Sequence, residues 1–207
     1  ILSTGCRKAL EKAVSLGYIR HNPADKPDLP KVQKAEIKPL ADSEMIAFLN
    51  AIKGHEYEAV YLVTLFTGMR KGEVLGLTWD CIDFKSGTIT IKQQLQKVRG
   101  TGGEYILAPT KNGKSRIVAP AKYVMQILTR QRKTQNEQRL KAGPAWSNPL
   151  DLVFTNSLGK NLCAQTVYLH FKKLAAEAGV PDARFHDLRH SYAVAALRSG
   201  DDIKTVQ

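Results

Sequence analysis

The chain has 207 residues, of which 43% are hydrophobic, and its formal net charge is +12 at pH 7. This length can form one sizeable buried core with an appendage, and no apolar run approaches the roughly 18 residues that a membrane span needs. Three widely spaced cysteines, Cys6, Cys81 and Cys163, indicate neither a disulfide framework nor a zinc site. The first residues show no signal-peptide pattern, so we expect a cytoplasmic protein with reduced, mostly buried thiols and no membrane partner.

The positive charge is concentrated in one part of the chain. Residues 85–141 hold thirteen Lys or Arg against two acids, a net charge of +11, whereas all other residues together carry +1. A solvated surface usually mixes the two signs, so this block favours a polyanionic partner. A membrane surface is the weaker alternative, because no basic amphipathic helix with an aromatic face accompanies the block.

The first 39 residues differ in composition from the rest. Residues 4–21 have the apolar spacing of a helix that should end near Gly17. Residues 22–39 contain four prolines and no apolar periodicity, which is typical of an extended, semi-rigid linker. We therefore interpret residues 1–21 as the remnant helix of a preceding domain, 22–39 as a linker, and 40–207 as the main domain.

The main domain begins with helical patterns. Residues 42–53 predict a short helix, and residues 56–68 are apolar nearly all round, as in a buried helix, with Gly68 as its C′ residue. Residues 71–79 predict one or two further helical turns. Later helices are expected over 121–142, over 164–179 and from about His186 onward, with a short extended segment at 152–154.

Between these helices, three short runs have the composition of strands. They cover residues 87–91, 104–109 and 115–120 and are separated by turn residues. Asn112-Gly113 tolerates positive φ, so the last two runs are predicted to pair as a hairpin. The whole pattern predicts an α+β fold: a mainly helical domain with a small antiparallel three-stranded β-sheet.

The stretch "HDLRHSYA" groups His186, Arg189 and His190 at the start of the last helix. Residues three and four apart share one side of a helix. Arginine offers a planar charged fork that matches two phosphate oxygens, and imidazole can donate a hydrogen bond or move a proton near neutral pH. The group therefore predicts a phosphate site, with a solvated or interhelical His–Arg pair as the alternative.

Two other stretches carry candidate site residues. In "LFTGMRKGEVLGLTWDCI", Arg70 follows a buried helix and a glycine, and Glu73 is placed to orient it. The alternative for Arg70 is a cation that interacts with the helix dipole. In "TKNGKSR", the candidates are Lys111, Lys114 and Arg116, which we expect to be mobile basic residues on a loop; the alternative is an ordinary solvated turn.

Together, these three stretches resemble the catalytic domain of the tyrosine recombinase family, which includes the phage integrases. "TGMRKGEVLGLTWDCIDF" is similar to the first arginine box of the family, "TKNGKSRIVAP" to its β-hairpin lysine segment, and "HDLRHSYA" to its His-x-x-Arg box, in family order. The resemblance covers roughly residues 38–207. It implies the tyrosine recombinase fold for residues 40–207 and a core-binding domain as the source of residues 1–21.

The resemblance implies a role for each matching residue. Arg70 and Arg189 would clamp the scissile phosphate and stabilise the transition state, Lys111 would protonate the departing 5′-oxygen, and His186 would assist proton transfer. Glu73 would be a supporting acid. No metal or other cofactor is implied, because side chains supply the positive charge.

The remaining candidates have weaker assignments. His190 is expected to pack against or support the His-x-x-Arg box, whereas Lys114 and Arg116 are expected to bind DNA. Lys114 is also the rival of Lys111 as the general acid, because the register of the hairpin is not fixed by the sequence.

The resemblance also implies residues that this sequence does not contain. The family continues with a second histidine or tryptophan and then a nucleophilic tyrosine, whereas this chain ends at Gln207, eighteen residues after Arg189. Tyr192 is nearest, but it lies in the same helix as Arg189. We therefore expect a C-terminally truncated domain that binds double-stranded DNA without cleaving it and is a monomer.

For the full-length parent, the resemblance implies site-specific recombination through a 3′-phosphotyrosyl intermediate, within a tetrameric synapse on nucleoid DNA. The main alternative is a non-catalytic DNA-binding module, in which the site candidates need not converge. A hydrolase or transferase for small phosphorylated molecules and a helical interaction domain are further alternatives. The sequence lacks the phosphate-binding glycine loop that such a hydrolase or transferase would need. A helical interaction domain would leave the basic block unexplained.

Overall fold

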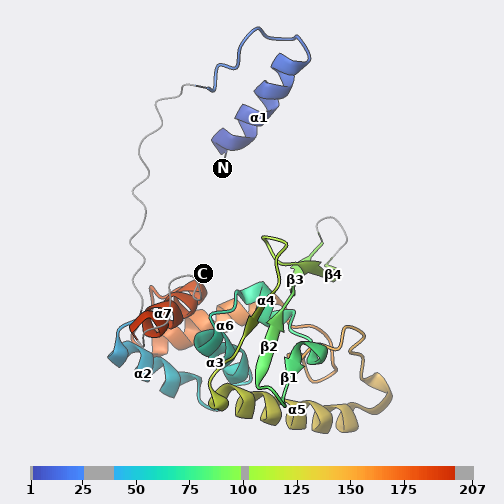
Figure 1. Cartoon of the computed structure of the whole chain (residues 1–207), viewed down its shortest axis with the longest axis vertical. Coiled ribbons are helices and arrows are strands. Elements are labelled where there is room, and N and C mark those ends of the chain that lie inside the picture. Colours follow the sequence, from blue (N-terminus) through green and yellow to red (C-terminus); the bar gives the residue numbers. More distant parts are fainter. Residues whose placement is uncertain (1, 26–39, 99–102, 199–207) are drawn as a thin grey trace. The chain divides into compact units, whose positions relative to one another are not determined.

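The computed structural model describes residues 2–25, 40–98 and 103–198. The chain divides into two compact units, Ile1–Glu36 and Ile37–Gln207. Within the described residues, no helix is both long and apolar enough to span a membrane. Figure 1 shows the helices and strands of both units.

In its described residues, 2–25, the first unit contains the helix α1 (Leu2–Ser15). Gly17 adopts φ 76° just after it, which ends the helix where the sequence predicted. Asn22 then donates a side-chain hydrogen bond to the carbonyl of Arg7, 3.1 Å away. Arg7 also forms an ion pair with Asp25 at 3.2 Å. The residues after α1 therefore fold back along it.

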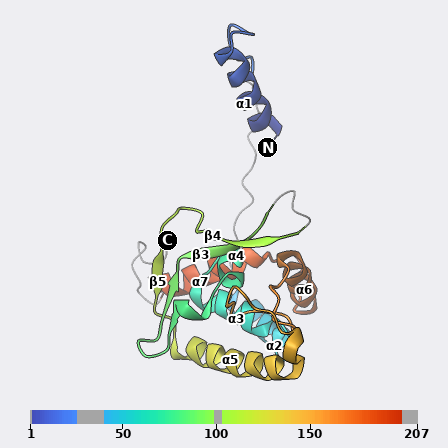
Figure 2. The same cartoon turned by 90° about the vertical axis from the view of Figure 1, so that its right-hand side faces the viewer.

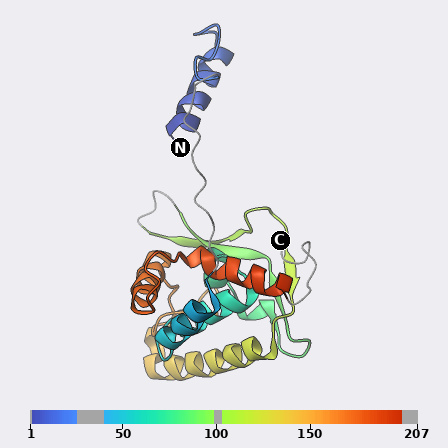
Figure 3. The same cartoon turned by 90° about the vertical axis from the view of Figure 1, so that its left-hand side faces the viewer.

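The second unit is mainly helical, as predicted. Its helices are α2 (Asp42–Ile52), α3 (Glu58–Thr67), α4 (Lys71–Leu75), α5 (Lys122–Ala142), α6 (Ala164–Glu177) and α7 (Phe185–Arg198). Two short 3₁₀ turns, Trp79–Cys81 and Gly143–Ala145, lie in the connections. In the three views, α5 lies on the opposite side of this unit from the strands β3 (Gln93–Lys97) and β4 (Tyr105–Pro109) (Figures 2 and 3).

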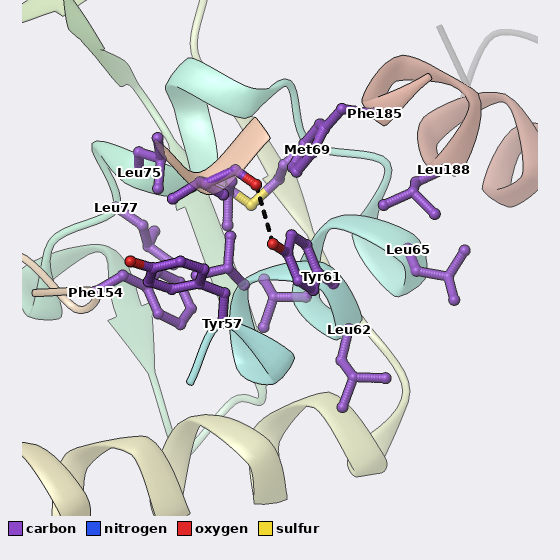
Figure 4. Close-up of a cluster of buried hydrophobic side chains, with 14 of the residues drawn as sticks. Tyr57, Tyr61, Leu62, Leu65, Met69, Leu75, Leu77, Phe154, Phe185 and Leu188 are labelled. Carbon is purple, nitrogen blue, oxygen red and sulfur yellow. Dashed lines mark hydrogen bonds between the residues drawn. The ribbon is translucent and has the colours of Figure 1, made fainter. Parts of the chain in front are cut away.

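Helix α3 is the centre of the hydrophobic core. It is buried nearly all round, as its sequence predicted, and it packs against both α5 and α7. Tyr61 at its middle is fully buried, and its hydroxyl donates a hydrogen bond to the carbonyl of Val167 on α6 at 3.0 Å (Figure 4). Burial of each large aliphatic side chain of α3, such as Leu62 or Leu65, stabilises the fold by about 1.5–3 kcal/mol. The core therefore fixes α3 as a rigid support for the residues at its two ends.

A small three-stranded antiparallel sheet is present, but it contains only two of the three predicted runs, 87–91 and 115–120. Its strand order is β1-β2-β5, formed by Ile82–Asp83, Thr88–Ile91 and Arg116–Val118. In the register of the central pair, Ile89 faces Val118 and Ile91 faces Arg116. Strands β3 and β4 form a separate two-stranded sheet.

The predicted hairpin of residues 104–109 and 115–120 is wrong. Strand β4 pairs with β3, and β5 pairs with β2, so the two runs belong to different sheets. The turn itself is as expected, because Gly113 adopts φ 67° and its N–H donates to the carbonyl of Thr110 at 2.8 Å. The sequence did not reveal β3, because its residues QQLQK lack the alternation of apolar and polar residues that marks a strand.

The cysteines differ from expectation. All three are free thiols, but Cys6 and Cys163 are exposed and Cys81 alone is buried. Cys163 directly precedes α6, and the hydroxyl of Tyr105 lies 3.6 Å from its sulfur. Hydrogen bonds from Thr166 and Tyr105 lower the pKa of the Cys163 thiol to about 7. The prediction of mostly buried thiols is therefore wrong.

Candidate active site

Arg70 is held between two helices. Helix α3 ends at Thr67, and Gly68 takes a left-handed conformation with φ 62° while its N–H donates to the carbonyl of Thr64 at 3.0 Å. Met69 is buried, and Arg70 occupies the N-cap position of α4. This sharp connection anchors the backbone of Arg70 at the end of a core helix, as the sequence suggested.

Glu73 joins Arg70 to Arg116. The Glu73 side chain is only 1% exposed, and its carboxylate accepts hydrogen bonds from the backbone N–H of Arg70 at 2.9 Å and from Arg70 Nη1 at 2.8 Å. The same carboxylate accepts from Arg116 Nη2 at 2.6 Å and from Arg116 Nη1 at 3.2 Å. One buried acid thus orients two guanidinium groups, from α4 and from β5, each of which is about a third exposed.

The hydrogen bonds keep Glu73 ionised. Burial by itself raises the pKa of this carboxyl, but the hydrogen bonds from Arg116 and Arg70 outweigh burial and lower the pKa to about 2. Glu73 therefore carries its negative charge throughout the neutral range and neutralises one of the nearby arginines.

Arg189 brings α7 to the same place. Its Nη1 donates a hydrogen bond to the carbonyl of Gly68, at the end of α3. Burial, followed by repulsion from Arg70 and Arg116, lowers the pKa of Arg189. Three guanidinium groups therefore lie close to one another with Glu73 as their acidic partner, so two positive charges remain uncompensated. Such a cluster is suited to a phosphate or another anion with two negative charges.

His186 lies beside the arginines. Burial lowers its pKa most, and the neighbouring His190, Arg189 and Arg70 lower it further. The His186 and His190 rings meet edge to face, with centroids 4.6 Å apart. His186 is therefore neutral at physiological pH. In this form its imidazole can donate a hydrogen bond from one nitrogen and accept a proton on the other.

The lysines of the predicted hairpin lie outside this cluster. Lys111 and Lys114 are exposed on the turn between β4 and β5. The turn is closed by Thr110, whose hydroxyl donates to the carbonyl of Lys114 at 2.7 Å. Arg116, two residues further on, connects this segment to the cluster through Glu73.

The expectation that Arg116 is a mobile loop residue is wrong. It lies on β5 and makes a two-pronged contact with buried Glu73. Arg116 and Val118 are both half-buried while Ile117 between them is exposed, so the strand turns the Arg116 side chain inward. The sequence Arg-Ile-Val has no alternation of polar and apolar residues that could have revealed this orientation. Lys71 was not singled out either; it is half-buried, with its Nζ 5.1 Å from the centre of the Tyr168 ring.

The structure thus brings together five residues from three separate parts of the sequence: Arg70, Glu73, Arg116, His186 and Arg189. We call these five residues the arginine cluster. Comparison with known proteins then gives the family, because residues 38–207 match the profile of the phage integrase family. The chain belongs to the phage integrase family. The resemblance to tyrosine recombinases, first seen in three motifs, is confirmed.

Individual relatives in this family are tyrosine recombinases. A tyrosine recombinase XerC-like protein of Caldanaerobacter subterraneus subsp. tengcongensis is 32% identical over 210 residues, covering 94% of this chain and 54% of that protein. The tyrosine recombinase XerA of Saccharolobus solfataricus is 27% identical, covering 90% of this chain and 52% of that protein. The chain spans about half the length of these curated relatives.

Solved structures of integrases share the fold. The Tn1549 transposon integrase in complex with a circular intermediate DNA superposes with a TM-score of 0.81 at 21% identity, covering 99% of this chain and 68% of that chain. A lambda integrase dimer bound to a COC′ core site gives a TM-score of 0.61 at 16% identity, with coverage of 99% and 68%. The predicted α+β catalytic-domain fold of the integrases is therefore confirmed.

Proposed function

We propose that this protein is the catalytic part of a site-specific DNA recombinase, which integrates or excises a mobile element by breaking and rejoining double-stranded DNA. The observation that carries the proposal is the arginine cluster. A DNA-binding module without catalysis does not require three arginines, a buried acid and a neutral histidine from distant segments to meet at one place. An enzyme that stabilises a phosphoryl transition state requires such a cluster.

In the proposed reaction, Arg70 and Arg189 hold the two non-bridging oxygens of the scissile phosphate. A tyrosine oxygen loses its proton and attacks phosphorus, the bond to the 5′-oxygen breaks as that oxygen takes up a proton, and a 3′-phosphotyrosyl bond forms. The pentacoordinate transition state carries one more negative charge than the diester. The two uncompensated positive charges of the cluster support this assignment, because they favour the transition state over the ground state.

Proton transfer is assigned to Lys111 and His186. Lys111 donates a proton to the departing 5′-oxygen, with Lys114 as its rival, because both side chains are exposed on one turn and free to reach DNA. His186 assists as a neutral imidazole next to Arg189. Glu73 acts as the supporting acid by holding Arg70 and Arg116, and His190 supports His186 by ring packing.

We also propose that the nucleophilic tyrosine is not among these 207 residues. Tyr61 is fully buried and donates to Val167, Tyr168 packs on Lys71, and the Tyr123 ring packs on Phe66. The side chain of Tyr192 lies outside the described residues. The 207-residue chain is then expected to bind double-stranded DNA as a monomer without forming a covalent product. In the full-length protein, the cleaving assembly is a tetrameric synapse in the cytoplasm, associated with the nucleoid.

The proposal is tested by DNA binding. Fluorescence anisotropy with duplex DNA is expected to show strong binding by the wild-type chain and weaker binding by the Arg70→Ala/Arg189→Ala double variant. The matched control is Arg130→Ala/Lys133→Ala on α5, which removes the same charge outside the cluster. Equal losses in both double variants would contradict a phosphate site and favour the DNA-binding module.

Cleavage is tested with a nicked suicide substrate on a denaturing gel. No covalent band is expected from the 207-residue chain. A full-length protein that includes the downstream tyrosine segment should give a band, and the Arg70→Ala/Arg189→Ala variant of that protein should not. A band from the 207-residue chain would overturn the assignment of the nucleophile. The absence of a band from a full-length protein that recombines DNA would overturn the proposed reaction.

A further inference from the structure

Two histidines from distant segments meet at the other end of α3. His55 lies in the connection between α2 and α3, and His170 lies on α6. His55 Nε2 and His170 Nδ1 are 3.1 Å apart. Glu56 is adjacent, and one ligand atom from each of the three residues lies within 4.8 Å of the other two.

The two imidazole rings are held in place by aromatic neighbours. The His170 ring packs edge to face on Tyr57, with centroids 5.1 Å apart, and the His55 ring lies 5.5 Å from the same Tyr57 ring and 6.2 Å from Tyr61. The site therefore contains two imidazole rings whose positions are set by packing before any ion binds.

We propose that His55, Glu56 and His170 form a binding site for a divalent transition-metal ion, with Zn²⁺ as the ion that matches best. Two imidazole nitrogens and a carboxylate oxygen, with a fourth position open to water, are a ligand set that zinc uses in proteins. Zinc–nitrogen bonds of about 2.0–2.1 Å at a tetrahedral angle place the nitrogens about 3.3 Å apart. The observed 3.1 Å is close to this value.

Metal binding requires adjustments at two of the three ligands. The Glu56 side chain is exposed, so rotation about its side-chain bonds can bring the carboxylate to the metal. His55 Nδ1 now accepts a hydrogen bond from the N–H of Tyr57 at 3.1 Å, and His55 Nε2 is hydrogen-bonded to His170 Nδ1. When Nε2 binds metal, the neutral ring carries its proton on Nδ1 instead, so the metal bonds replace both hydrogen bonds and the His55 ring turns away from the Tyr57 N–H.

The site is separate from the arginine cluster. His55 precedes the first residue of α3 and Arg70 follows its last, so the two sites lie at opposite ends of a ten-residue helix about 15 Å long. A metal ion here would link the connection before α3 to α6, and it would bind the folded chain but not the unfolded one. The expected effect is on stability, independent of the proposed DNA cleavage.

The test uses the 207-residue chain, free of any affinity tag, with Co²⁺ and Zn²⁺ as probes. One Co²⁺ per chain is expected to give the visible absorption bands of a four-coordinate site, and Zn²⁺ should displace it. Zn²⁺ at a hundredfold excess over its Kd should raise the midpoint of thermal unfolding by about 5–10 °C. Mg²⁺, which prefers oxygen ligands, should neither displace Co²⁺ nor raise the midpoint of thermal unfolding.

Three variants locate the ion. His170→Asn and His55→Gln, which keep a polar side chain without an imidazole ring, should abolish the Co²⁺ bands, and Glu56→Gln should weaken Zn²⁺ binding by about tenfold or more. The control is Cys6→Ser/Cys163→Ser, because these two exposed thiols are the competing ligands. Wild-type affinity in His170→Asn, loss of the bands in the cysteine variant, or no bands in the wild-type protein would each overturn the proposal.

Discussion

At the scale of single residues, Glu73 determines the geometry of the arginine cluster. A buried carboxylate is costly unless hydrogen bonds replace its hydration. Glu73 receives them from the backbone and side chain of Arg70 and from both nitrogens of the Arg116 fork. The guanidinium groups are therefore fixed in place before any ligand arrives, which favours binding of an anion.

Replacing Glu73 should destabilise the protein strongly. Glu73→Gln keeps the shape but leaves two arginines without a counter-charge, and we expect a loss of about 3 kcal/mol in the free energy of unfolding. Urea denaturation measures this loss. The control is Asp80→Asn, which breaks the exposed pair between Asp80 and Lys92 and should change stability by less than about 1 kcal/mol. Equal effects of the two changes would show that Glu73 is not a buried structural acid.

The same carboxylate predicts an acid-dependent loss of stability. The pKa of Glu73 is about 2 in the folded protein against an ordinary 4.5. Because the folded pKa is the lower one, the unfolded chain binds the proton first, and the contribution of Glu73 is complete above pH 4.5 and is lost as the pH falls towards 2. Denaturation curves at several pH values should show a steeper decline in this window for the wild type than for Glu73→Gln. Parallel pH profiles would contradict the lowered pKa.

At the scale of elements, the short helix α4 is placed by a close approach to β3. A Cβ atom at Gly76 would lie 2.4 Å from the backbone N of Leu95 and 2.8 Å from the backbone carbon of Gln94. Backbone atoms cannot rotate away as side chains do, so this position requires glycine. Because Arg70 is the N-cap residue of α4 and Glu73 lies within the helix, the approach also sets the position of the arginine cluster.

Gly76→Ala should therefore force α4 and β3 apart. We expect a loss of about 1–3 kcal/mol in the free energy of unfolding, as for other overpacked positions. Gly72 in the same helix is the matched control, because a Cβ there would meet its nearest neighbours at 3.4 Å. Gly72→Ala should be near neutral, and thermal unfolding of both variants measures the difference. A Gly76→Ala protein as stable as Gly72→Ala would contradict the close approach.

At the scale of the whole second unit, the basic block of the sequence is not one surface. Arg116 joins the arginine cluster, and Lys111 and Lys114 project from an exposed turn. The other basic residues include six on α5, which lies opposite the β3–β4 side against which α4 packs (Figures 1 and 2). These six are Lys122, Arg130, Arg132, Lys133, Arg139 and Lys141. Residues close in sequence therefore face different directions.

This distribution predicts which charges govern the salt dependence of DNA binding. Each phosphate contact contributes about −0.9 to the slope of log K against log salt concentration. The slope for the Arg70→Ala/Arg189→Ala variant should be shallower by about 2, because two phosphate contacts are lost. The slope for Arg130→Ala/Lys133→Ala should change by less than about 0.9, the contribution of one contact. Anisotropy titrations at several salt concentrations measure both slopes. A larger change in the α5 variant would place the DNA on the opposite side.

The sequence by itself determined the helices, the turn glycines, the family and most of the candidate site. Helical periodicity, a helix-ending Gly68 and the three motifs depend on residues within a few positions of one another, so they can be read locally. Arg70, Glu73, His186 and Arg189 were found in this way.

Only the tertiary structure decided which distant groups meet. The pairing of β5 with β2 rather than β4, the contact between Arg116 and Glu73 across 43 positions, and the contact between His55 and His170 across 115 positions leave no local pattern. They arise because packing of the core around α3 brings separate segments together, and their geometry depends on every element in between.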